Sequence, residues 1–437
     1  MSGSKIKVLV VGGGGREHAI AWKTAQSPLV SEVLVAPGNA GTARERNVRN
    51  VAVAADDFGR LLDLALTERV GLTIVGPETP LVAGLVDRFE ERGLRCFGPR
   101  AAGAQLEGSK AFTKEFLARH AIPTAGYRTF TEAALARAYV AAREPPFVIK
   151  ADGLAAGKGV VIAQTVAEAD AALTRMLEQK QFGAAGTKVV IEGFLPGEEA
   201  SFIALVDGER VVPLASSQDH KTRDDGDRGP NTGGMGAYSP APVVTESVHR
   251  HVMQDIMLPT VRGLLADGIH YRGFLYAGLM IDSAGRAKVV EFNCRLGDPE
   301  TQPILFRLRS DLVALCLSCF DGTLGLQPIA WDPRATVGVV LASRGYPDAY
   351  EKGKRITGLE GVSGDDAKIF HAGTRLANGD VLTDGGRVLC AVGIGETVGL
   401  AQRRAYDAVA KVTWDGAFWR RDIGYRAVQR EQARAVR

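Results

Sequence analysis

The sequence lacks the features of a membrane-bound, secreted or nucleic-acid-binding protein. No apolar stretch approaches the ~18 residues of a membrane span, and Met1–Lys5 has no apolar segment of a secretory signal. No run of five or more basic residues occurs, and the net charge is only +3, which argues against electrostatic capture of a polyanion. We expect neither a nucleic-acid partner nor a membrane anchor.

Cysteine is scarce, with only Cys96, Cys294, Cys316, Cys319 and Cys390. An odd, sparse count without a secretory signal favours reduced thiols and a cytoplasmic location. Cys316 and Cys319 form a CxxC, but no second pair with zinc spacing exists. The segment around them resembles an amphipathic helix, so we interpret both as buried thiols rather than as a redox or metal site.

The composition, with 46% apolar and 24% charged residues in 437, is that of an ordinary globular protein. This length predicts about two to four domains. We expect an N-terminal α/β domain at 1–107, a central domain at 108–330 with a subdomain at about 125–195, and a C-terminal α+β domain at 331–437.

Residues 6–100 alternate apolar strands with helices, which predicts a Rossmann-like parallel sheet covered on both faces. The expected strands are Ile6–Val11, Val33–Ala36, Leu72–Val75 and Arg95–Phe97. The expected helices are Arg16–Gln26, Phe58–Arg69 and Leu81–Arg92. Ligands of such sheets bind beyond the carboxyl ends of the strands.

The turn after the first strand resembles a dinucleotide-binding fingerprint but does not complete it. Glu17 stands where the third glycine should let the helix approach the strand, and no acidic residue ends the second strand to bind a ribose. An NAD site is therefore disfavoured. The glycines at Gly12–Gly15 and the helix start still suit a phosphate group.

Later segments predict a mixed architecture. A helix is expected at 108–124, with Ser109 and Lys110 at its start. Further strands are expected at Ser201–Val206, Arg210–Pro213, Leu275–Ile281, Lys288–Phe292, Thr336–Ala342 and Arg387–Ile394. A last helix is expected at Val398–Val412.

The segment Phe147–Ile162 reads as a β-hairpin with a glycine-rich tip. An apolar strand ends in Lys150, and a loop of small residues carrying Lys158 precedes the next strand. Small residues let backbone N–H groups approach phosphate oxygens, and the two lysines add charge. The Walker spacing is absent. The alternative is a solvated hairpin with two surface lysines.

A strand–turn–strand segment, Leu279–Pro303, carries a candidate metal site. Glu291 and Asn293 are two residues apart on the second strand, so their side chains share one face. One carboxylate with one amide oxygen suits Mg²⁺, which takes its other ligands from phosphates and water. Charged residues crowd the loop that follows, and burying them would demand counter-charges or a metal. The alternative is a solvated loop.

Two further segments are candidates for substrate contact. Gln218–Pro242 is a long polar, glycine-rich loop, and loops of this length are usually functional or disordered. Its Asp219, His220, Lys221 and Arg223 could orient an anionic or amino substrate, although a solvent-facing loop histidine is the commoner case. Ile191–Phe202 passes from one strand to another and could present backbone groups to a base; a plain connection is the alternative.

Together these segments resemble the ATP-grasp superfamily, and more closely the phosphoribosylamine–glycine ligase family, over essentially the whole chain. The matching motifs are GGGGREHA (Gly12–Ala19), APGNAGT (Ala36–Thr42), LEGSKAFTK (Leu106–Lys114), IKADGLAAGKGV (Ile149–Val160), SQDHK (Ser217–Lys221), GPNTGGMGAYSPAP (Gly229–Pro242), GFLYAGLM (Gly273–Met280), EFNCRLGDPETQ (Glu291–Gln302) and GGRVLC (Gly385–Cys390). In this resemblance the central domain is the ATP-grasp domain, and its subdomain is a mobile lid.

The resemblance implies ATP-dependent ligation of glycine to 5-phosphoribosylamine in purine biosynthesis, with Mg²⁺ or Mn²⁺. The implied ATP-binding residues are Lys110, Lys150, Gly153, Gly157, Lys158, Glu192, Leu195 and Glu199. The implied metal ligands are Glu291 and Asn293. The implied substrate contacts are Gly14, Gly15, Asn39, Asp219, Lys221, Asn231, Gly234, Arg295 and Asp298. The implied catalytic residues are Lys150, Lys158, Lys221 and Arg295.

The chemistry fits these residues independently of the resemblance. A carboxylate must be phosphorylated before an amine can displace its oxygen, giving a glycyl phosphate intermediate. Phosphoryl transfer needs alignment and charge neutralisation rather than a nucleophilic residue, and no G-x-S-x-G elbow is present. Gly193 departs from the family pattern, where a second acidic residue is expected, and we expect a looser contact with the edge of the adenine.

Three other functions remain open at this point: another ATP-grasp ligase, an oxidoreductase and a non-catalytic nucleotide sensor. Phosphoribosylamine is labile, so transient contact with the upstream amidophosphoribosyltransferase is also expected.

Overall fold

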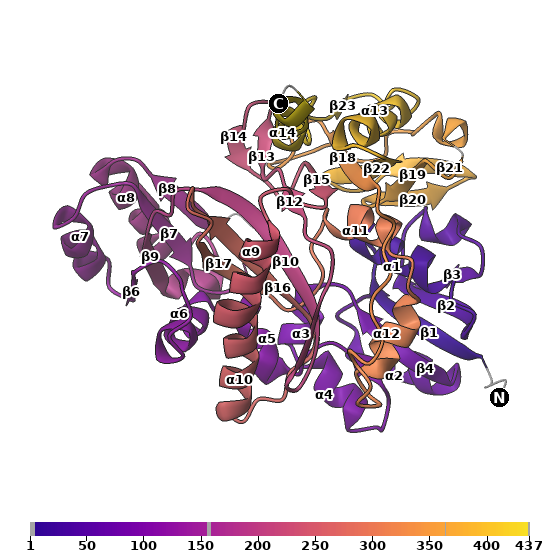
Figure 1. The fold of residues 1–437 in the computed structure, drawn as a ribbon, viewed down its shortest axis with the longest axis horizontal. Coiled ribbons are helices and arrows are strands. Elements are labelled where there is room, and N and C mark those ends of the chain that lie inside the picture. Colours follow the sequence, from indigo (N-terminus) through magenta and orange to yellow (C-terminus); the bar gives the residue numbers. More distant parts are fainter. Residues whose placement is uncertain (1–4, 155–158, 363, 436–437) are drawn as a thin grey trace.

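The computed structural model describes residues 5–154, 159–362 and 364–435. In Figure 1 the N-terminal sheet lies on the right, the C-terminal sheet at the top, and a lobe formed by β6–β9 with α7 and α8 projects to the left. Within the described ranges, no helix has both the length and the apolar character needed to cross a membrane.

The N-terminal part is the predicted parallel sheet, in the order β3-β2-β1-β4-β5. Its strands are β1 (Ile6–Gly12), β2 (Val30–Pro37), β3 (Val48–Asn50), β4 (Val70–Val75) and β5 (Cys96–Phe97). Its helices are α1 (Gly15–Thr24), η1 (Thr42–Arg44), α2 (Phe58–Thr67), α3 (Glu78–Val82), α4 (Leu85–Glu90) and α5 (Ala101–Gly108). Val8–Val11 are buried on both faces, as expected of a parallel strand between helices.

Two predicted helices differ from the structure. The single helix expected at Leu81–Arg92 is two helices, because Gly84 adopts a left-handed conformation (φ +84°) that ends one helix before the next begins. The helix expected at 108–124 is α6 (Lys110–Arg119). Its predicted start is confirmed, since Ser109 caps it by accepting a hydrogen bond from the Phe112 N–H.

The projecting lobe contains the predicted hairpin. Its sheet has the order β6-β9-β7-β8. The elements are β6 (Tyr127–Phe130), α7 (Ala133–Ala141), β7 (Phe147–Ala151), β8 (Val160–Ala163), α8 (Val166–Leu173), η2 (Thr174–Glu178), η3 (Gly183–Thr187) and β9 (Val189–Gly193). Lys150 pairs in register with Val160 at the end of the hairpin strands, as the predicted hairpin requires.

A second antiparallel sheet, in the order β11-β10-β16-β17, forms the floor beneath that lobe. Its strands are β10 (Glu198–Asp207), β11 (Arg210–Pro213), β16 (Arg272–Ile281) and β17 (Ala287–Asn293). Helices associated with this part of the chain are α9 (Glu246–Val252), η4 (Met253–Met257), α10 (Leu258–Ala266), α11 (Thr301–Arg307) and α12 (Leu312–Ser318). The CxxC cysteines are buried and free, as predicted.

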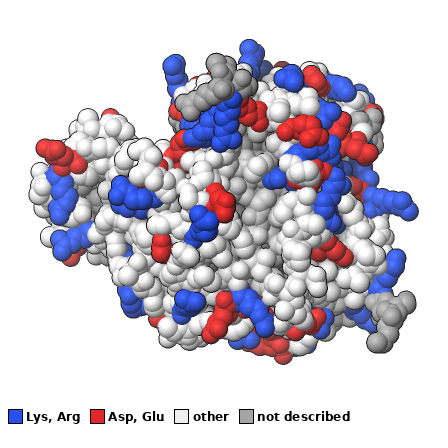
Figure 2. Space-filling view, in the orientation of Figure 1, with Lys and Arg blue, Asp and Glu red and all other residues white. Residues whose placement is uncertain are grey.

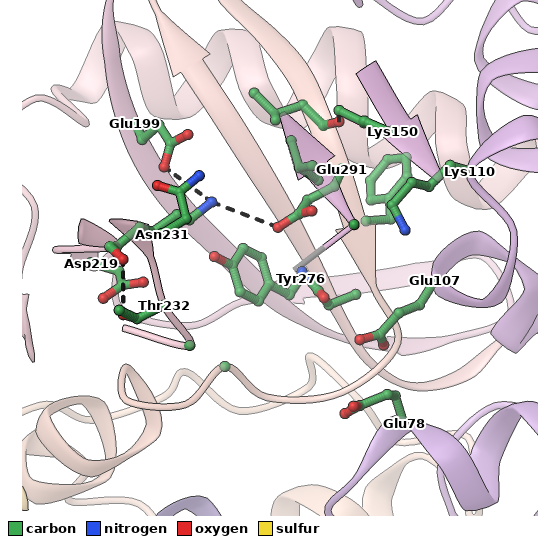
Figure 3. A pocket seen from close by; sticks show the side chains of 18 of the residues that line it. Glu78, Glu107, Lys110, Lys150, Glu199, Asp219, Asn231, Thr232, Tyr276 and Glu291 are labelled. Carbon is green, nitrogen blue, oxygen red and sulfur yellow. Dashed lines mark hydrogen bonds and ion pairs between the residues drawn. The ribbon is translucent and has the colours of Figure 1, made fainter. Parts of the chain in front are cut away.

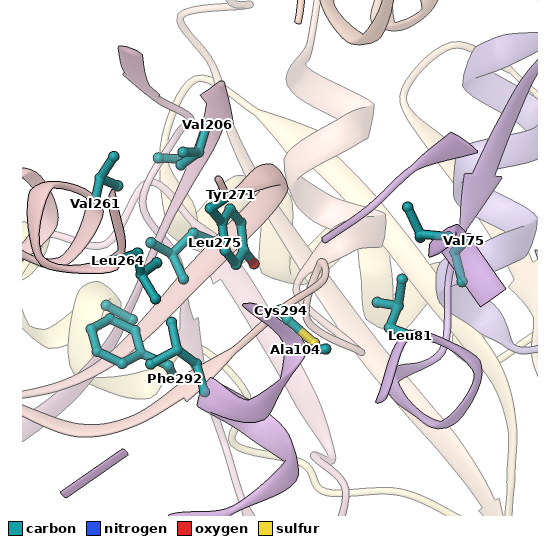
Figure 4. Packing of buried hydrophobic residues seen from close by; sticks show 14 of the residues in the cluster. Val75, Leu81, Ala104, Val206, Val261, Leu264, Tyr271, Leu275, Phe292 and Cys294 are labelled. Carbon is teal, nitrogen blue, oxygen red and sulfur yellow. The ribbon is translucent and has the colours of Figure 1, made fainter. Parts of the chain in front are cut away.

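One apolar cluster joins this floor to the N-terminal part (Figure 4). Phe292 on β17 and Leu275 on β16 pack with Leu264 of α10, and the same cluster contains Val75 of β4 and Leu81 of α3 from the N-terminal part. Burying apolar side chains from both parts in one core fixes their relative position.

The long polar segment 218–242 is not a simple loop. It contains β12 (Gln218–Asp219), β13 (Thr222–Asp224), β14 (Arg228–Asn231) and β15 (Gly236–Ser239). β15 pairs with β18 (Ala335–Ser343), so the C-terminal sheet has the order β12-β15-β18-β22-β19 and contains strands from both sides of residue 331. Such short strands pair with a partner about a hundred residues away, which local periodicity does not reveal.

The C-terminal part completes this sheet. Its remaining elements are η5 (Leu359–Gly361), β19 (Ala367–His371), β20 (Thr374–Ala377), β21 (Asp380–Thr383), β22 (Arg387–Gly395), α13 (Val398–Val409), β23 (Ala417–Phe418) and α14 (Tyr425–Ala435). Basic side chains (Lys, Arg) and acidic side chains (Asp, Glu) are interspersed over the face shown in Figure 2, in keeping with the small net charge.

A buried polar cluster connects the N-terminal and C-terminal parts. On α1, His18 Nε2 lies 3.0 Å from Glu45 Oε1. His18 Nδ1 accepts a hydrogen bond from the His371 N–H at 2.7 Å. Lys368 pairs with the same Glu45 oxygen at 2.6 Å. Burial opposes ionisation of Glu45, but the bonds to His18 and Lys368 outweigh it and lower the carboxyl pKa to about 2.

We predict that Glu45→Gln lowers the free energy of unfolding at pH 7 by about 2–3 kcal/mol, because one pKa unit corresponds to ~1.4 kcal/mol. The depressed pKa stabilises the folded state fully above pH 4.5, and this contribution is lost as the pH falls through about 2. Urea titrations at pH 7 and about pH 3 should therefore show a smaller deficit at the lower pH.

The control is Glu246→Gln, whose exposed carboxylate pairs with Arg250 on the helix surface; it should change stability by less than ~0.5 kcal/mol. An equal deficit of Glu45→Gln at both pH values would contradict the assignment.

Candidate functional site

A cavity of about 640 Å³ lies where the projecting lobe, the floor sheet and the C-terminal part meet. Figure 3 shows side chains from these separate segments directed into it. Most of the predicted site residues line it: Lys110, Lys150, Glu192, Leu195, Glu199, Asp219, Lys221, Asn231, Glu291, Asn293, Arg295 and Asp298. Side chains spread over nearly two hundred residues of sequence therefore share one space.

Lys150 takes part in a buried charge cluster with Glu192 and Lys114. The Glu192 carboxylate lies 2.8 Å from Lys150 Nζ through one oxygen and 2.8 Å from Lys114 Nζ through the other, and all three side chains are at most 5% exposed. Lys150 also donates to the Val290 carbonyl at 3.0 Å. Burial is the main cause that lowers the pKa of Lys114, to about 8, so Glu192 compensates two cations in a poorly solvated place.

Lys110 stands at the start of α6, where its Nζ donates to the Gly153 carbonyl at 2.9 Å. Asp152 holds the helix start by accepting hydrogen bonds from Ser109 Oγ and the Ala111 N–H. The predicted Gly153 is thus tied to the base of α6 rather than lining the cavity. Gly157 and Lys158, also predicted to contact ATP, lie outside the described residues.

Glu291 faces these lysines from β17. Burial alone would raise its pKa, but the nearby Lys221, Lys150 and Lys110 lower it to about 2. Lys221 Nζ lies 3.7 Å from Glu291 Oε1 and 3.0 Å from Glu199 Oε2. Glu291 is therefore an ionised carboxylate surrounded by cations.

Asn293 and Arg295 follow on the same segment. Arg295 Nη2 donates to Asn293 Oδ1 at 3.0 Å and pairs with Glu107 at 2.6 Å, while its Nε lies 3.3 Å from Glu78. Glu107 also accepts the Cys294 N–H at 2.8 Å. Burial raises the pKa of Glu107, so its bonds to Arg295 and Cys294 are what make a carboxylate tolerable there.

Asp219 is the unpaired acid of the site. Its Oδ1 is buried and has no hydrogen-bond partner among the described residues. Burial first, and then the neighbouring Glu300, raise the pKa of Asp219 well above its usual range. A buried acceptor without a partner is unfavourable, so this position suits a ligand that brings a donor.

Four predicted substrate contacts lie outside the cavity lining, behind its wall. A side chain on Gly15 would collide with Gln302, and one on Gly14 would approach Asp298. Gly234 packs against Asp219 and Pro299. Asn39 donates to the carbonyls of Gly13 and His371. Gly14 and Gly234 thus lie next to Asp298 and Asp219, which line the cavity.

His220 does not face solvent as a loop histidine would. Its side chain is fully buried, and Nε2 accepts the Gly424 N–H at 2.9 Å. This bond attaches the segment after Asp219 to the C-terminal part. The residue is therefore structural in this conformation.

The dinucleotide interpretation is further disfavoured by Glu17. Its carboxylate accepts the Gly14 N–H at 2.6 Å and pairs with Arg16 Nε at 2.6 Å. Its side chain lies so close to Gly76 that even a Cβ there would collide with it. Glu17 thus fills the space above the sheet edge.

Sequence reasoning missed several residues that shape the cavity. Glu107 and Lys114 lie inside a motif quoted for the resemblance, LEGSKAFTK, where only Lys110 was given a role. Arg387 lies in another, GGRVLC. Tyr276 lies in a third, GFLYAGLM, and only Tyr346 lies outside the quoted motifs; the folding of distant segments brings both tyrosines to the cavity wall.

We predict that Glu192→Gln destabilises the protein by about 3–5 kcal/mol at pH 7, because it leaves two buried lysines without a counter-charge. Lys114→Met is the matched control: it leaves Glu192 paired with Lys150 and should cost much less. Urea unfolding without nucleotide measures both. Equal destabilisation by the two substitutions would contradict the charge balance described above.

Comparisons with known proteins identify the family of this chain. Sequence models of phosphoribosylglycinamide synthetase match residues 6–107 (N domain), 108–301 (ATP-grasp domain) and 336–426 (C domain). A phosphoribosylamine–glycine ligase of Allochromatium vinosum is 61% identical, covering 98% of this chain and 100% of that protein, and one of Salmonella typhi is 60% identical over the same shares.

Solved structures agree on the fold. A phosphoribosylamine–glycine ligase of Thermotoga maritima has a TM-score of 0.83 at 37% identity, covering 96% of this chain and all of that one. The biotin carboxylase domain of Hydrogenobacter thermophilus 2-oxoglutarate carboxylase, at 16% identity, has a TM-score of 0.73 over 95% of this chain and 92% of that one, and shows the shared fold alone. Sequence, structure and site together show that the chain belongs to the phosphoribosylamine–glycine ligase (phosphoribosylglycinamide synthetase) family of ATP-grasp enzymes.

Proposed function

We propose that this protein ligates glycine to 5-phosphoribosylamine at the expense of ATP, giving glycinamide ribonucleotide, ADP and phosphate in purine biosynthesis. The observation that carries the proposal is the single cavity with Lys110 and Lys150 on one wall and Glu291 with Asn293 on the other. Relatives about 60% identical over their full length are named for this ligation.

ATP is proposed to lie with its phosphates between these walls. Lys110 and Lys150 would neutralise phosphate oxygens, together with Lys158 in the tip of the lid. Glu192 and Leu195 would border the adenine, and Glu199 the ribose. Lys150 is bonded to Glu192 and to the Val290 carbonyl, which would preorganise its ammonium group before phosphate arrives.

A divalent cation fits the opposite wall. Glu291 is ionised, because its pKa is about 2, and Asn293 offers an amide oxygen beside it. Among the side chains in the described part of the chain, no group of three or more His, Cys, Asp or Glu is placed to hold a metal alone. Mg²⁺ or Mn²⁺ would therefore complete its shell with phosphate and water oxygens, as Mg²⁺ commonly does, and would supply charge neutralisation there.

The amine side of the site is proposed at Asp219, Lys221, Asn231, Arg295 and Asp298. The unpaired Asp219 oxygen would accept a hydrogen bond from the ammonium group of glycine, which would also favour ionisation of the acid. Lys221, two residues further on and next to Glu291, would direct the glycine carboxylate toward the ATP.

The reaction then needs two displacements. In the first, a glycine carboxylate oxygen attacks the γ-phosphorus of ATP, and ADP leaves. In the second, the ribosylamine nitrogen attacks the acyl carbon of glycyl phosphate, and inorganic phosphate leaves as the amine loses a proton. Glycyl phosphate hydrolyses readily, so water must be excluded. Closure of the glycine-tipped lid over the cavity would exclude it.

The remaining proposals concern organisation and setting. We propose domain limits of 1–107, 108–330 and 331–437, with the lid at about 125–195. The five buried free thiols favour a reducing cytoplasm. Lability of phosphoribosylamine favours direct handover from the amidophosphoribosyltransferase, and a coupled assay in which an added trap intercepts all of the amine would contradict that handover.

Purified protein with ATP and Mg²⁺ should release ADP only when glycine and freshly generated phosphoribosylamine are both present. Lys150→Ala and Glu291→Ala should each reduce turnover at least ~100-fold, because each removes charge that the phosphoryl transfer requires. Lys288→Ala, an exposed position on the same strand as Glu291, is the control and should retain wild-type rates.

Bicarbonate-dependent ADP release without glycine would instead favour a carboxylase-like ATP-grasp reaction. ATP binding without turnover would favour a nucleotide sensor. Wild-type rates in Lys150→Ala would contradict the proposal that phosphoryl transfer takes place in this cavity.

A further inference from the structure

The motif GGRVLC (Gly385–Cys390) has no role in the function as described so far. Arg387 opens β22 in the C-terminal sheet, and its side chain reaches the cavity, where it is 22% exposed. The cavity thus has one arginine contributed by a part of the chain that holds none of the proposed ATP or metal contacts.

Arg387 joins two segments that are more than sixty residues apart in sequence. Its Nη1 donates to the Gly233 carbonyl at 2.5 Å and to the Asp298 carbonyl at 2.6 Å. Its Nη2 lies 3.5 Å from Asp298 Oδ2. One planar guanidinium therefore sets the distance between the two segments, which a lysine with a single nitrogen would not do in the same way.

Gly233 is held from its other side as well. The Tyr346 hydroxyl accepts the Gly233 N–H at 2.8 Å, so both backbone groups of this glycine bond to the C-terminal part. A Cβ on Gly233 would lie 2.9 Å from Arg387 Cζ. A side chain at this position would thus push the guanidinium away.

The segments joined in this way carry the acids of the amine side. Gly234, next to Gly233, packs against Asp219 so closely that a Cβ there would be 2.7 Å from Asp219 Oδ1. This buried oxygen has no hydrogen-bond partner within residues 5–154, 159–362 and 364–435. The position of Asp219 relative to Asp298 therefore depends on how Arg387 and Tyr346 hold Gly233.

We propose that Arg387 is a positioning residue for glycine, which sets the spacing of Asp219 and Asp298 so that they receive the ammonium group, and that Tyr346 assists it. This inference rests on the proposed function. Arg387 bonds Gly233 and Asp298, whereas Lys150 bonds Glu192 and the Val290 carbonyl. We therefore expect ATP binding to be independent of Arg387.

The test is Arg387→Lys in the full-length protein, which keeps the charge but loses the bridge between two carbonyls. We expect the KM for glycine to rise at least about tenfold, since hydrogen bonds from a charged donor are lost. The Kd for ATP, measured in the absence of glycine and phosphoribosylamine, should remain within about twofold of wild type. Tyr346→Phe should raise the glycine KM in the same direction by a smaller factor, about threefold to fivefold.

Arg404→Lys is the matched control. Arg404 also bonds a backbone carbonyl, that of Ile394, and an acid, Asp366, but both lie within the C-terminal part. It should leave both constants unchanged. Hydrogen exchange supplies a readout without activity: amides of 232–236 should exchange faster in Arg387→Lys than in wild type and Arg404→Lys.

The outcomes separate the two levels of inference. If wild-type protein shows no glycine-dependent ADP release, the proposed function fails. If wild type is active but Arg387→Lys keeps a wild-type glycine KM, or loses ATP affinity to the same degree, the positioning role is wrong. Should Arg387→Lys not fold, an unchanged glycine KM in Tyr346→Phe overturns the proposal, and an increase confined to glycine supports it.

Discussion

The pairing of buried charges is the constraint on which the rest of this structure depends. Ionised side chains are costly to remove from water unless an opposite charge or a hydrogen bond compensates them. Here Lys150 and Lys114 share Glu192, and Arg295 is held by Glu107. Each pair joins segments that are distant in sequence, so satisfying these charges also brings the walls of the cavity together.

Two acids of the cavity indicate where ligands belong. Glu291 is kept ionised by surrounding lysines while remaining in the cavity wall. Asp219 has a buried oxygen without a hydrogen-bond partner in the described part of the chain. A cation beside the first and an amine beside the second would complete the electrostatics, which is the arrangement that activation of a carboxylate by ATP followed by amide formation requires.

The C-terminal part belongs to the site rather than standing beside it. Its sheet takes in β12 and β15, the strands that flank the predicted substrate segment, and it holds His220 through Gly424. Asp227 of the same segment is bonded by Arg420 and Tyr425. The proposed substrate side of the cavity is thus shaped by the C-terminal sheet, whereas the proposed nucleotide side is shaped by the projecting lobe and the floor sheet.

Local sequence patterns were sufficient to predict a feature that depends on a single strand or helix. The two-residue spacing of Glu291 and Asn293 on a strand, and Lys150 at the end of another, could be read directly, as could the parallel N-terminal sheet. The pairing of β15 with β18 could not be predicted. The four residues of β15, Gly-Ala-Tyr-Ser, carry no signal for a partner about a hundred positions away. Asn39, expected at the substrate, bonds the carbonyls of Gly13 and His371, and its substrate contact stays a prediction. Arg387 was given no role.

Long-range charge pairs are also not visible in local sequence patterns. The partner of a buried charge is selected by the assembled fold, so Glu107 gives no sign in the sequence that it will hold Arg295. A resemblance to a family supplies the motif but not the contact. The structure supplies the contact and, with it, a reason for each motif residue.

We propose that the triphosphate of one ATP is bound between the lysines of one cavity wall and a divalent ion on the other. A crystal structure with a non-hydrolysable ATP analogue and Mn²⁺, with the metal located by its anomalous scattering, tests it most directly. The account predicts Mn²⁺ bonded to Glu291 and Asn293, with the phosphates within hydrogen-bond distance of Lys110 and Lys150. A nucleotide bound elsewhere, or Mn²⁺ away from Glu291, would contradict it.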